Sequence, residues 1–166
     1  IVAYLREDTQ NESELAFVIG KSRIAPMRQL SIPRLELQAA MYATRLRDSI
    51  IAEHDVVFSK IYHWSDSMTV LHWLHSSHKK QTVFVANRIA EILENSTIDE
   101  WNFVNGLKNP ADIGTRGMTI SELNDSDWIK GPKWLTKSPE YWPEQPAVLN
   151  TTDDEVPEVV SCSSNV

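Results

Sequence analysis

Cysteine is almost absent from this sequence, because Cys162 is the single example among 166 residues. One cysteine cannot form a disulfide within the chain, so a disulfide-stapled scaffold is excluded. Glycine is also scarce, at five residues, and no glycine-rich loop follows a predicted strand, so a Rossmann or P-loop nucleotide site has no support. No apolar run approaches the ~20 residues that span a bilayer, and residues 1–6 lack a signal-peptide pattern. We therefore expect a soluble, intracellular, cytoplasmic protein with no membrane partner.

An excess of basic residues is lacking as well. The chain holds 16 Lys and Arg against 23 Asp and Glu, which gives a formal net charge of −7. Residues 1–117 are nearly neutral, and most of the negative charge falls in residues 118–166. Because a strong nucleic-acid binder usually carries a basic excess, the composition does not predict tight binding of nucleic acid by this domain alone.

The composition divides the chain into three parts. Residues 1–117 are long enough for one globular domain. Residues 118–143 form an extension rich in Trp and Pro. We expect the three tryptophans of this extension to pack it against the domain. Residues 144–166 offer no periodic apolar face to bury, and we predict a disordered acidic linker there.

Strand and helix patterns alternate along the first part and predict an α/β domain. The predicted strands cover residues 1–6, 14–21, 55–64 and 101–104, and residues 22–32, which contain Pro26, could supply a short third strand. The predicted helices cover residues 33–54, 68–74 and 83–94, and a further helical turn begins at Pro110. The first strand is already under way at Ile1, with no initiator Met, so we expect the chain to be a piece of a longer polypeptide.

Three acidic residues stand at element boundaries: Glu36 early in the first helix, Asp66 after the central strand, and Asp112 at the start of the last helical turn. Carboxylates from separate elements hold the two Mg²⁺ ions of many phosphodiester-cleaving sites. A structural explanation competes, in which Glu36 and Asp112 are first-turn acids that favour the helix dipole and Asp66 is a helix N-cap. Spacing alone leaves both explanations open.

Several sequence motifs occur in a fixed order around these acids. They are KSRIAP at 21–26, SIPRLELQAA at 31–40, WSDS at 64–67, FVANRIAEI at 84–92 and NPAD at 109–112. Together they closely resemble the ribonuclease H domain of BEL/Pao-type retrotransposon polyproteins. The motif WIKGPKWL at 128–135 resembles the segment that follows this domain, so the resemblance covers about residues 1–143.

The resemblance implies a ribonuclease H-like fold, in which a mixed sheet has its first three strands antiparallel and carries helices on both faces. It implies hydrolysis of the RNA strand of RNA-DNA hybrids during reverse transcription, with two Mg²⁺ held by four carboxylates; Mn²⁺ is expected to substitute. Glu36, Asp66 and Asp112 match the second, third and fourth of these acids. In the family the first Asp lies in an Asp-Ala-Ser context several residues ahead of the part that matches Val2. The 166 residues lack it, so we expect this fragment to be inactive.

The same resemblance suggests partners. The parent polyprotein would carry a reverse transcriptase upstream and an integrase downstream, and would work in the cytoplasm, including inside virus-like particles. The basic residues nearest the motifs are the candidates for phosphate contacts with the hybrid, although solvated surface charge explains them equally well. They are Lys21, Arg23, Arg34, Arg88 and Arg116.

Two other functions compete with a ribonuclease. A catalytically dead or domesticated module of the same fold would bind nucleic acid or protein without cleaving, and the missing first Asp is its main support. A transposase or integrase core of the same fold is disfavoured, because such cores usually use three acids that end in Glu.

Overall fold

The two strands that open the chain pair as an antiparallel hairpin in the computed structural model, which describes residues 1–8, 13–27, 30–76 and 80–147. Strand β1 (Val2–Asp8) lies beside β2 (Ser13–Gly20), with Leu5 opposite Ala16. Both runs are rich in β-branched and aromatic residues, as strands prefer. The predicted hairpin is therefore confirmed.

A second, parallel pair of strands lies deeper in the molecule. Strand β3 (His63–Ser65) runs beside β4 (Trp101–Phe103), with Trp64 opposite Asn102. Parallel strands need a long crossover connection, and here it consists of α2 (Met68–His75) and α3 (Val83–Asn95). The pairing therefore brings together two segments that are distant in the sequence.

The long helix α1 (Ile32–Glu53) supplies one side of the apolar core. It packs on α3 and α2, and the fully buried side chains at this junction are Leu37, Val70, Leu71, Leu74 and Ile92. Burial of five such side chains, at roughly 1.5–3 kcal/mol each, is the main favourable contribution that holds these helices together.

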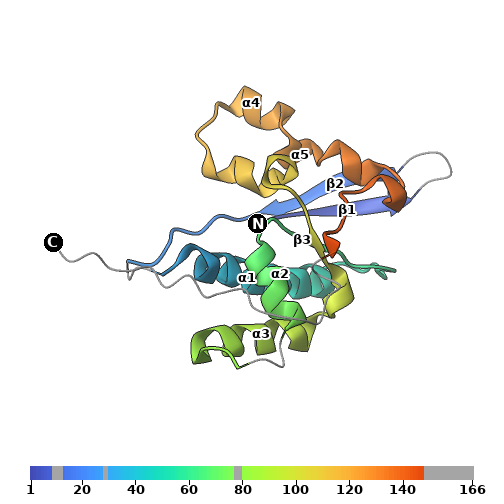
Figure 1. Cartoon of the computed structure of the whole chain (residues 1–166). Coiled ribbons are helices and arrows are strands. Elements are labelled where there is room, and N and C mark those ends of the chain that lie inside the picture. The colour runs from blue at the N-terminus through green and yellow to red at the C-terminus, as the bar shows by residue number, and fades with distance from the viewer. Residues whose placement is uncertain (9–12, 28–29, 77–79, 148–166) are drawn as a thin grey trace.

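Figure 1 shows helices on both sides of the hairpin: α1, α2 and α3 lie on one side, and α4 (Ile120–Asp125) and α5 (Asp127–Lys130) on the other. Short 3₁₀ turns complete the structure. They cover Ile98–Glu100, Gly106–Lys108, Pro110–Thr115, Lys133–Thr136 and Pro139–Tyr141. The arrangement is a mixed α/β fold with small sheets, and it is consistent with the ribonuclease H-like fold that the resemblance implies.

Two predicted strands are wrong in extent. Within the described residues, no strand forms in 22–27 or at residues 30 and 31, and the strand predicted over 55–64 is limited to β3. The sheet is correspondingly divided into two pairs, β1 with β2 and β3 with β4. A β-prone run becomes a strand only where a neighbouring backbone completes its hydrogen bonds. Val57, in such a run, is 96 % exposed.

The extension over residues 118–143 is attached to the hairpin through Trp128. The Trp128 ring lies directly against the backbone at Gly20 and Gly114, so close that a Cβ at either position would fall within 2.5 Å of a ring carbon. The Tyr4 hydroxyl donates to the carbonyls of Asp127 and Trp128, at 2.7 and 2.9 Å. Glycine at residues 20 and 114 therefore leaves the space that the indole ring occupies.

Two further tryptophans of the extension meet the β3 strand. The Trp134 and Trp142 rings contact Trp64 edge to face, with centroids 4.7 and 5.6 Å away. Packing reaches two residues beyond the predicted boundary at 143, because the Gln145 side chain accepts from the Phe103 amide and donates to its carbonyl. The predicted linker from residue 148 onward lies outside the described residues. Among the described helices, none is long and apolar enough to cross a membrane.

Replacing Gly114 with Ala is expected to destabilise the protein by about 1–3 kcal/mol, because the added methyl group forces the Trp128 ring out of its place. Gly117→Ala is the matched control, since a Cβ there meets nothing within 4 Å and the entropy change of the unfolded chain is the same. Urea denaturation of both variants measures the difference. Equal stabilities would contradict the role given to Trp128.

Candidate active site

Asp66, one of the three predicted acids, follows directly on β3. Its strand ends at Ser65, and α2 begins at Met68. The N-cap of α2 is Ser67, whose hydroxyl accepts a hydrogen bond from the Val70 amide at 3.2 Å. The structural explanation of Asp66 as an N-cap is therefore wrong, because its neighbour caps the helix and leaves the Asp66 carboxylate exposed.

Asp112 is placed by the NPAD motif. The Asn109 side chain accepts from the Ala111 amide at 3.0 Å, and Pro110 occupies the first position of the 3₁₀ turn, where its missing N–H costs nothing. Asp112 lies in the first turn that this cap starts. The first-turn explanation therefore stands for Asp112, alongside the role in the site.

The carboxylates of Asp66 and Asp112 converge on Gly106. A Cβ built at Gly106 would lie 3.4 Å from Asp66 Oδ2 and 3.7 Å from Asp112 Oδ2. Among the described residues, neither carboxylate has a hydrogen-bond or ion-pair partner. Carboxylate oxygens that face one point without a partner are ligands of the kind that a hard divalent cation takes.

Glu36 is held nearby through Ser67. The Ser67 hydroxyl donates to Glu36 Oε2 at 2.6 Å, while the same oxygen caps α2. Glu36 lies on the fifth residue of α1, beyond the first turn, which contains no acid, so the helix-dipole explanation does not apply to it. One serine thus ties the Glu36 side chain to the residue that follows Asp66.

All three acids line one cavity of about 870 Å³ between the hairpin and β3. Its walls include every residue of β1, the segment 56–66, and Ala39, Ala40 and Ala43 of α1. Trp128 touches both Gly20, which pairs with Val2, and Gly114, two residues after Asp112. The Trp128 ring therefore lies between the carboxyl end of β2 and the 3₁₀ turn that carries Asp112.

The donor set suits Mg²⁺ in its chemistry, since every candidate ligand is a carboxylate oxygen. The geometry is less complete: the part of the chain that the structure describes contains no group of three or more His, Cys, Asp or Glu arranged to hold a metal ion. Asp66 and Asp112 form a convergent pair, and Glu36 is joined to it only through Ser67.

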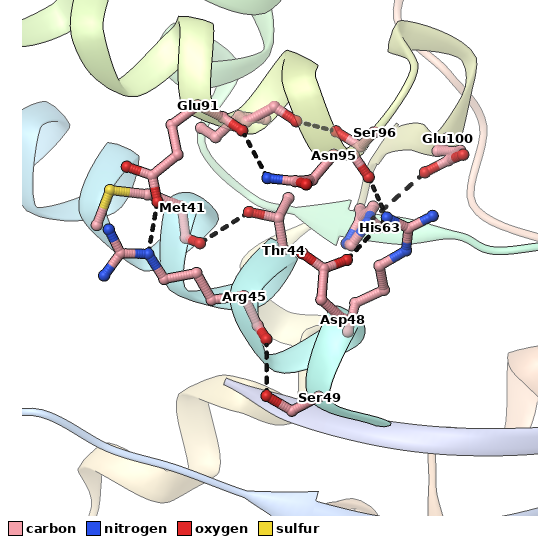
Figure 2. A network of polar contacts seen from close by, with 12 residues as sticks. Met41, Thr44, Arg45, Asp48, Ser49, His63, Glu91, Asn95, Ser96 and Glu100 are labelled. Carbon is pink, nitrogen blue, oxygen red and sulfur yellow. Dashed lines mark hydrogen bonds and ion pairs between the residues drawn. The ribbon is translucent and has the colours of Figure 1, made fainter. Parts of the chain in front are cut away.

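A buried histidine lies on the same strand as the site. His63 stacks on Trp101 with ring centroids 4.5 Å apart, and Figure 2 shows it among Asp48, Asn95 and Glu100. Burial, and then the nearby Arg47 guanidinium, lower the pKa of His63 to about 4. Its Nε2 lies 3.8 Å from Glu100 Oε2, too far for a hydrogen bond. The histidine is therefore neutral at pH 7.

The five basic residues nominated for phosphate contacts fall into two groups. Arg23 lies over the Tyr42 ring, and Arg34 and Arg88 lie over the Phe84 ring, on the α1 and α3 side of the molecule. Lys21 and Arg116 follow, by one and two residues, the glycines that flank Trp128. The cation–π contacts had no sequence signal beyond the motifs KSRIAP, SIPRLELQAA and FVANRIAEI, which contain four of the five residues involved; Tyr42 lies outside them.

The structure is an α/β domain in which two carboxylates, those of Asp66 and Asp112, converge and a third acid, Glu36, is linked to them through Ser67. Residues 1–67 match the family model of the Pao retrotransposon-like RNaseH-like domain. This match supports a BEL/Pao ribonuclease H-like domain, as the motifs predicted. The matched part includes Glu36 and Asp66, whereas the motifs quoted for residues 84–135 lie beyond it. No curated protein and no solved structure matches the chain.

Ser67→Ala is expected to lower the free energy of unfolding by about 1–2 kcal/mol, because α2 loses its cap and Glu36 loses its donor. Ser31→Ala is the matched control: Ser31 is the N-cap residue of α1, but its side chain makes no capping hydrogen bond. Denaturant titration at pH 7 compares the two. A loss as large in Ser31→Ala would show that the Ser67 contacts contribute nothing.

Stability is expected to fall between pH 6.5 and pH 4 through His63. The unfolded chain takes up a proton on this side chain near pH 6.5, while the folded chain does so only near pH 4. The contribution is complete above pH 6.5 and is lost as the pH falls, by about 2 kcal/mol between pH 7 and pH 5. His63→Phe, which keeps a ring against Trp101, should remove that part of the pH dependence in urea titrations. Identical pH profiles for the unaltered chain and His63→Phe would contradict the contribution assigned to His63.

Proposed function

We propose that this domain is a ribonuclease H that hydrolyses the RNA strand of RNA-DNA hybrids during reverse transcription. One observation carries the proposal: the Asp66 and Asp112 carboxylates, unpaired within the described residues, converge at Gly106 beside Glu36. The matched family supports a retrotransposon setting. In that setting the domain would lie between a reverse transcriptase and an integrase of one polyprotein.

The residues have distinct roles in this proposal. Asp66 and Asp112 would hold Mg²⁺ at the end of the cavity, and Ser67 would orient Glu36 toward the same place. Two bound Mg²⁺ ions would activate the attacking water and stabilise the leaving oxygen of the phosphodiester. The acids lie after a strand, on a helix and in a 3₁₀ turn. Each carboxylate is therefore held by an element of regular structure, and catalysis by positioning of the reacting groups requires such fixed side chains.

The cavity supports a further part of the proposal. β1 and β3 both present an unpaired edge to it within the described residues, and Val56 and Val57 are exposed beside it. Exposed strand edges next to apolar surface are unfavourable unless another strand covers them. We infer that a strand ahead of Ile1 fills the cavity and brings the fourth carboxylate to its acidic end, and that residues 1–166 alone are inactive without it.

Extending the chain at its amino end by a strand that carries the Asp-Ala-Ser motif is expected to give Mg²⁺-dependent cleavage of hybrid RNA. Asp66→Asn in the extended protein should reduce the cleavage rate by roughly 100-fold or more, because the substitution removes one charged ligand. Asp125→Asn is the control, since Asp125 is an exposed partner of Lys130. Cleavage of a labelled RNA-DNA hybrid is read on a denaturing gel.

A binding module without catalysis is the second candidate. The incomplete arrangement of metal ligands in the described residues favours it. If the extended protein binds the hybrid but leaves its RNA intact in both Mg²⁺ and Mn²⁺, the ribonuclease proposal fails and the binding module replaces it.

A further inference from the structure

Trp128 of the extension is packed between two glycines from different parts of the molecule. The Cζ2–Cε2 side of its indole ring faces Gly20 at the end of β2, and the Cζ3–Cη2 side faces Gly114. Gly114 lies in the same 3₁₀ turn as Asp112, two residues after it. The Tyr4 hydroxyl donates to the Trp128 carbonyl at 2.9 Å and ties the backbone below the ring to β1. One indole ring therefore connects the Asp112 turn to the hairpin.

Trp134, further along the extension, contacts the other two segments of the candidate site. Its indole N–H donates to the Lys108 carbonyl at 3.3 Å, and Lys108 ends the turn that begins at Gly106. Its ring meets Trp64, two residues before Asp66, edge to face with the centroids 4.7 Å apart. Trp134 therefore joins the strand that leads into Asp66 to the turn at which the two carboxylates converge.

The two turns otherwise make local hydrogen bonds in the part of the chain that the structure describes. The Lys108 amide donates to the Asn105 carbonyl at 2.7 Å, and the Asp112 amide donates to the Asn109 carbonyl at 3.2 Å. Leu107, between these donors, is 95 % exposed. A short 3₁₀ turn has poorer hydrogen-bond geometry than an α-helix, so its position depends on contacts from outside. The two tryptophans supply such contacts.

The backbone between Trp128 and Trp134 is fixed as well. Gly131 has φ 76°, in the left-handed region that favours glycine, and a Cβ there would fall 2.7 Å from the Leu15 Cδ1 of β2. Pro132, which follows, is buried, and with Trp134 it lines the cavity that contains the three acids. The two rings are therefore placed by a chain that is itself packed on the hairpin and the cavity. We refer to Trp128 and Trp134 as the tryptophan clasp.

We propose that the tryptophan clasp positions the Asp66 and Asp112 carboxylates for metal binding, so that residues 128–134 of the extension are part of the catalytic unit. The proposal deepens the ribonuclease function and rests on it for the reaction. The two tryptophans are positioning residues, because they act through the turns that they hold. A misplacement of about 1 Å can lower a rate by roughly 100-fold, so a loosened turn lowers turnover without weakening the binding of substrate.

The first test measures amide hydrogen exchange in the full 166-residue chain by NMR. We expect Trp134→Phe to speed exchange of the Asn109 amide, which closes the Gly106 turn, by roughly fivefold, because the variant keeps a ring against Trp64 but loses the N–H that holds the turn. Trp142→Phe is the matched control. Trp142 also meets Trp64 edge to face, and its indole N–H donates to a backbone carbonyl outside both turns, so the Asn109 rate should stay unchanged.

The second test separates positioning from a purely structural role. It uses the protein extended by the Asp-Ala-Ser strand, at a temperature where circular dichroism shows every variant to be fully folded. Trp134→Phe is expected to lower kcat for a labelled RNA-DNA hybrid by roughly tenfold and to leave KM within about twofold. Trp142→Phe should change neither constant. If Trp134→Phe does not fold, Trp128→Phe replaces it, with the Arg116 amide, which donates to the Ile113 carbonyl of the Asp112 turn, as the exchange probe.

The outcomes distinguish the clasp from the ribonuclease function. Equal exchange rates in Trp134→Phe and Trp142→Phe would overturn the clasp. Equal kcat values in an extended protein that cleaves, or a raised KM with kcat unchanged, would overturn it too, since neither result fits a positioning residue. If the extended protein with both tryptophans cleaves no hybrid in Mg²⁺ or Mn²⁺, the ribonuclease function fails, and the exchange rates alone decide whether the clasp holds the turns.

Discussion

The short parallel pairing of β3 with β4 is the constraint on which the candidate site depends. Three residues on each strand hold the pair together, and the chain leaves β3 directly into Asp66 and the Ser67 cap of α2. On the other strand, Val104, which is fully buried, donates its amide to the Ser65 carbonyl and directs the chain toward Gly106 and the NPAD turn. Asp66 and Asp112 therefore meet because one ladder aligns the two exits.

Ser67 links this ladder to the rest of the core. Its hydroxyl oxygen accepts a hydrogen bond from the Val70 amide of α2, and the hydroxyl donates to the Glu36 carboxylate. A single side chain therefore connects the start of α2 to the start of α1. The helices themselves are held by apolar packing, which sets their distance but is not directional. The orientation of the acidic side chains depends on the hydrogen bonds of two caps, Ser67 for α2 and Asn109 for the 3₁₀ turn Pro110–Thr115.

Electrostatics divide α1 lengthwise. One flank faces the cavity with alanines and Glu36, and the other carries arginines stacked on aromatic rings. Neither feature is visible in the net charge, because the acidic and basic residues within 1–117 nearly cancel in the sum. A near-neutral domain can therefore still contain a strongly charged surface where packing brings like charges together.

Local sequence predicts the hairpin, the three main helices, the order of the motifs and the three candidate acids, because these features depend on propensity, periodicity and caps that act within a few residues. It predicted too much strand over residues 22–32 and 55–64, since a β-prone run needs a partner that local sequence does not specify. Three features come from packing alone: Ser67 and not Asp66 caps α2, Asp66 and Asp112 converge on Gly106, and Arg23, Arg34 and Arg88 lie on aromatic rings. Each of these depends on distances between elements far apart in the chain, and such distances are set by how the helices and strands pack against each other.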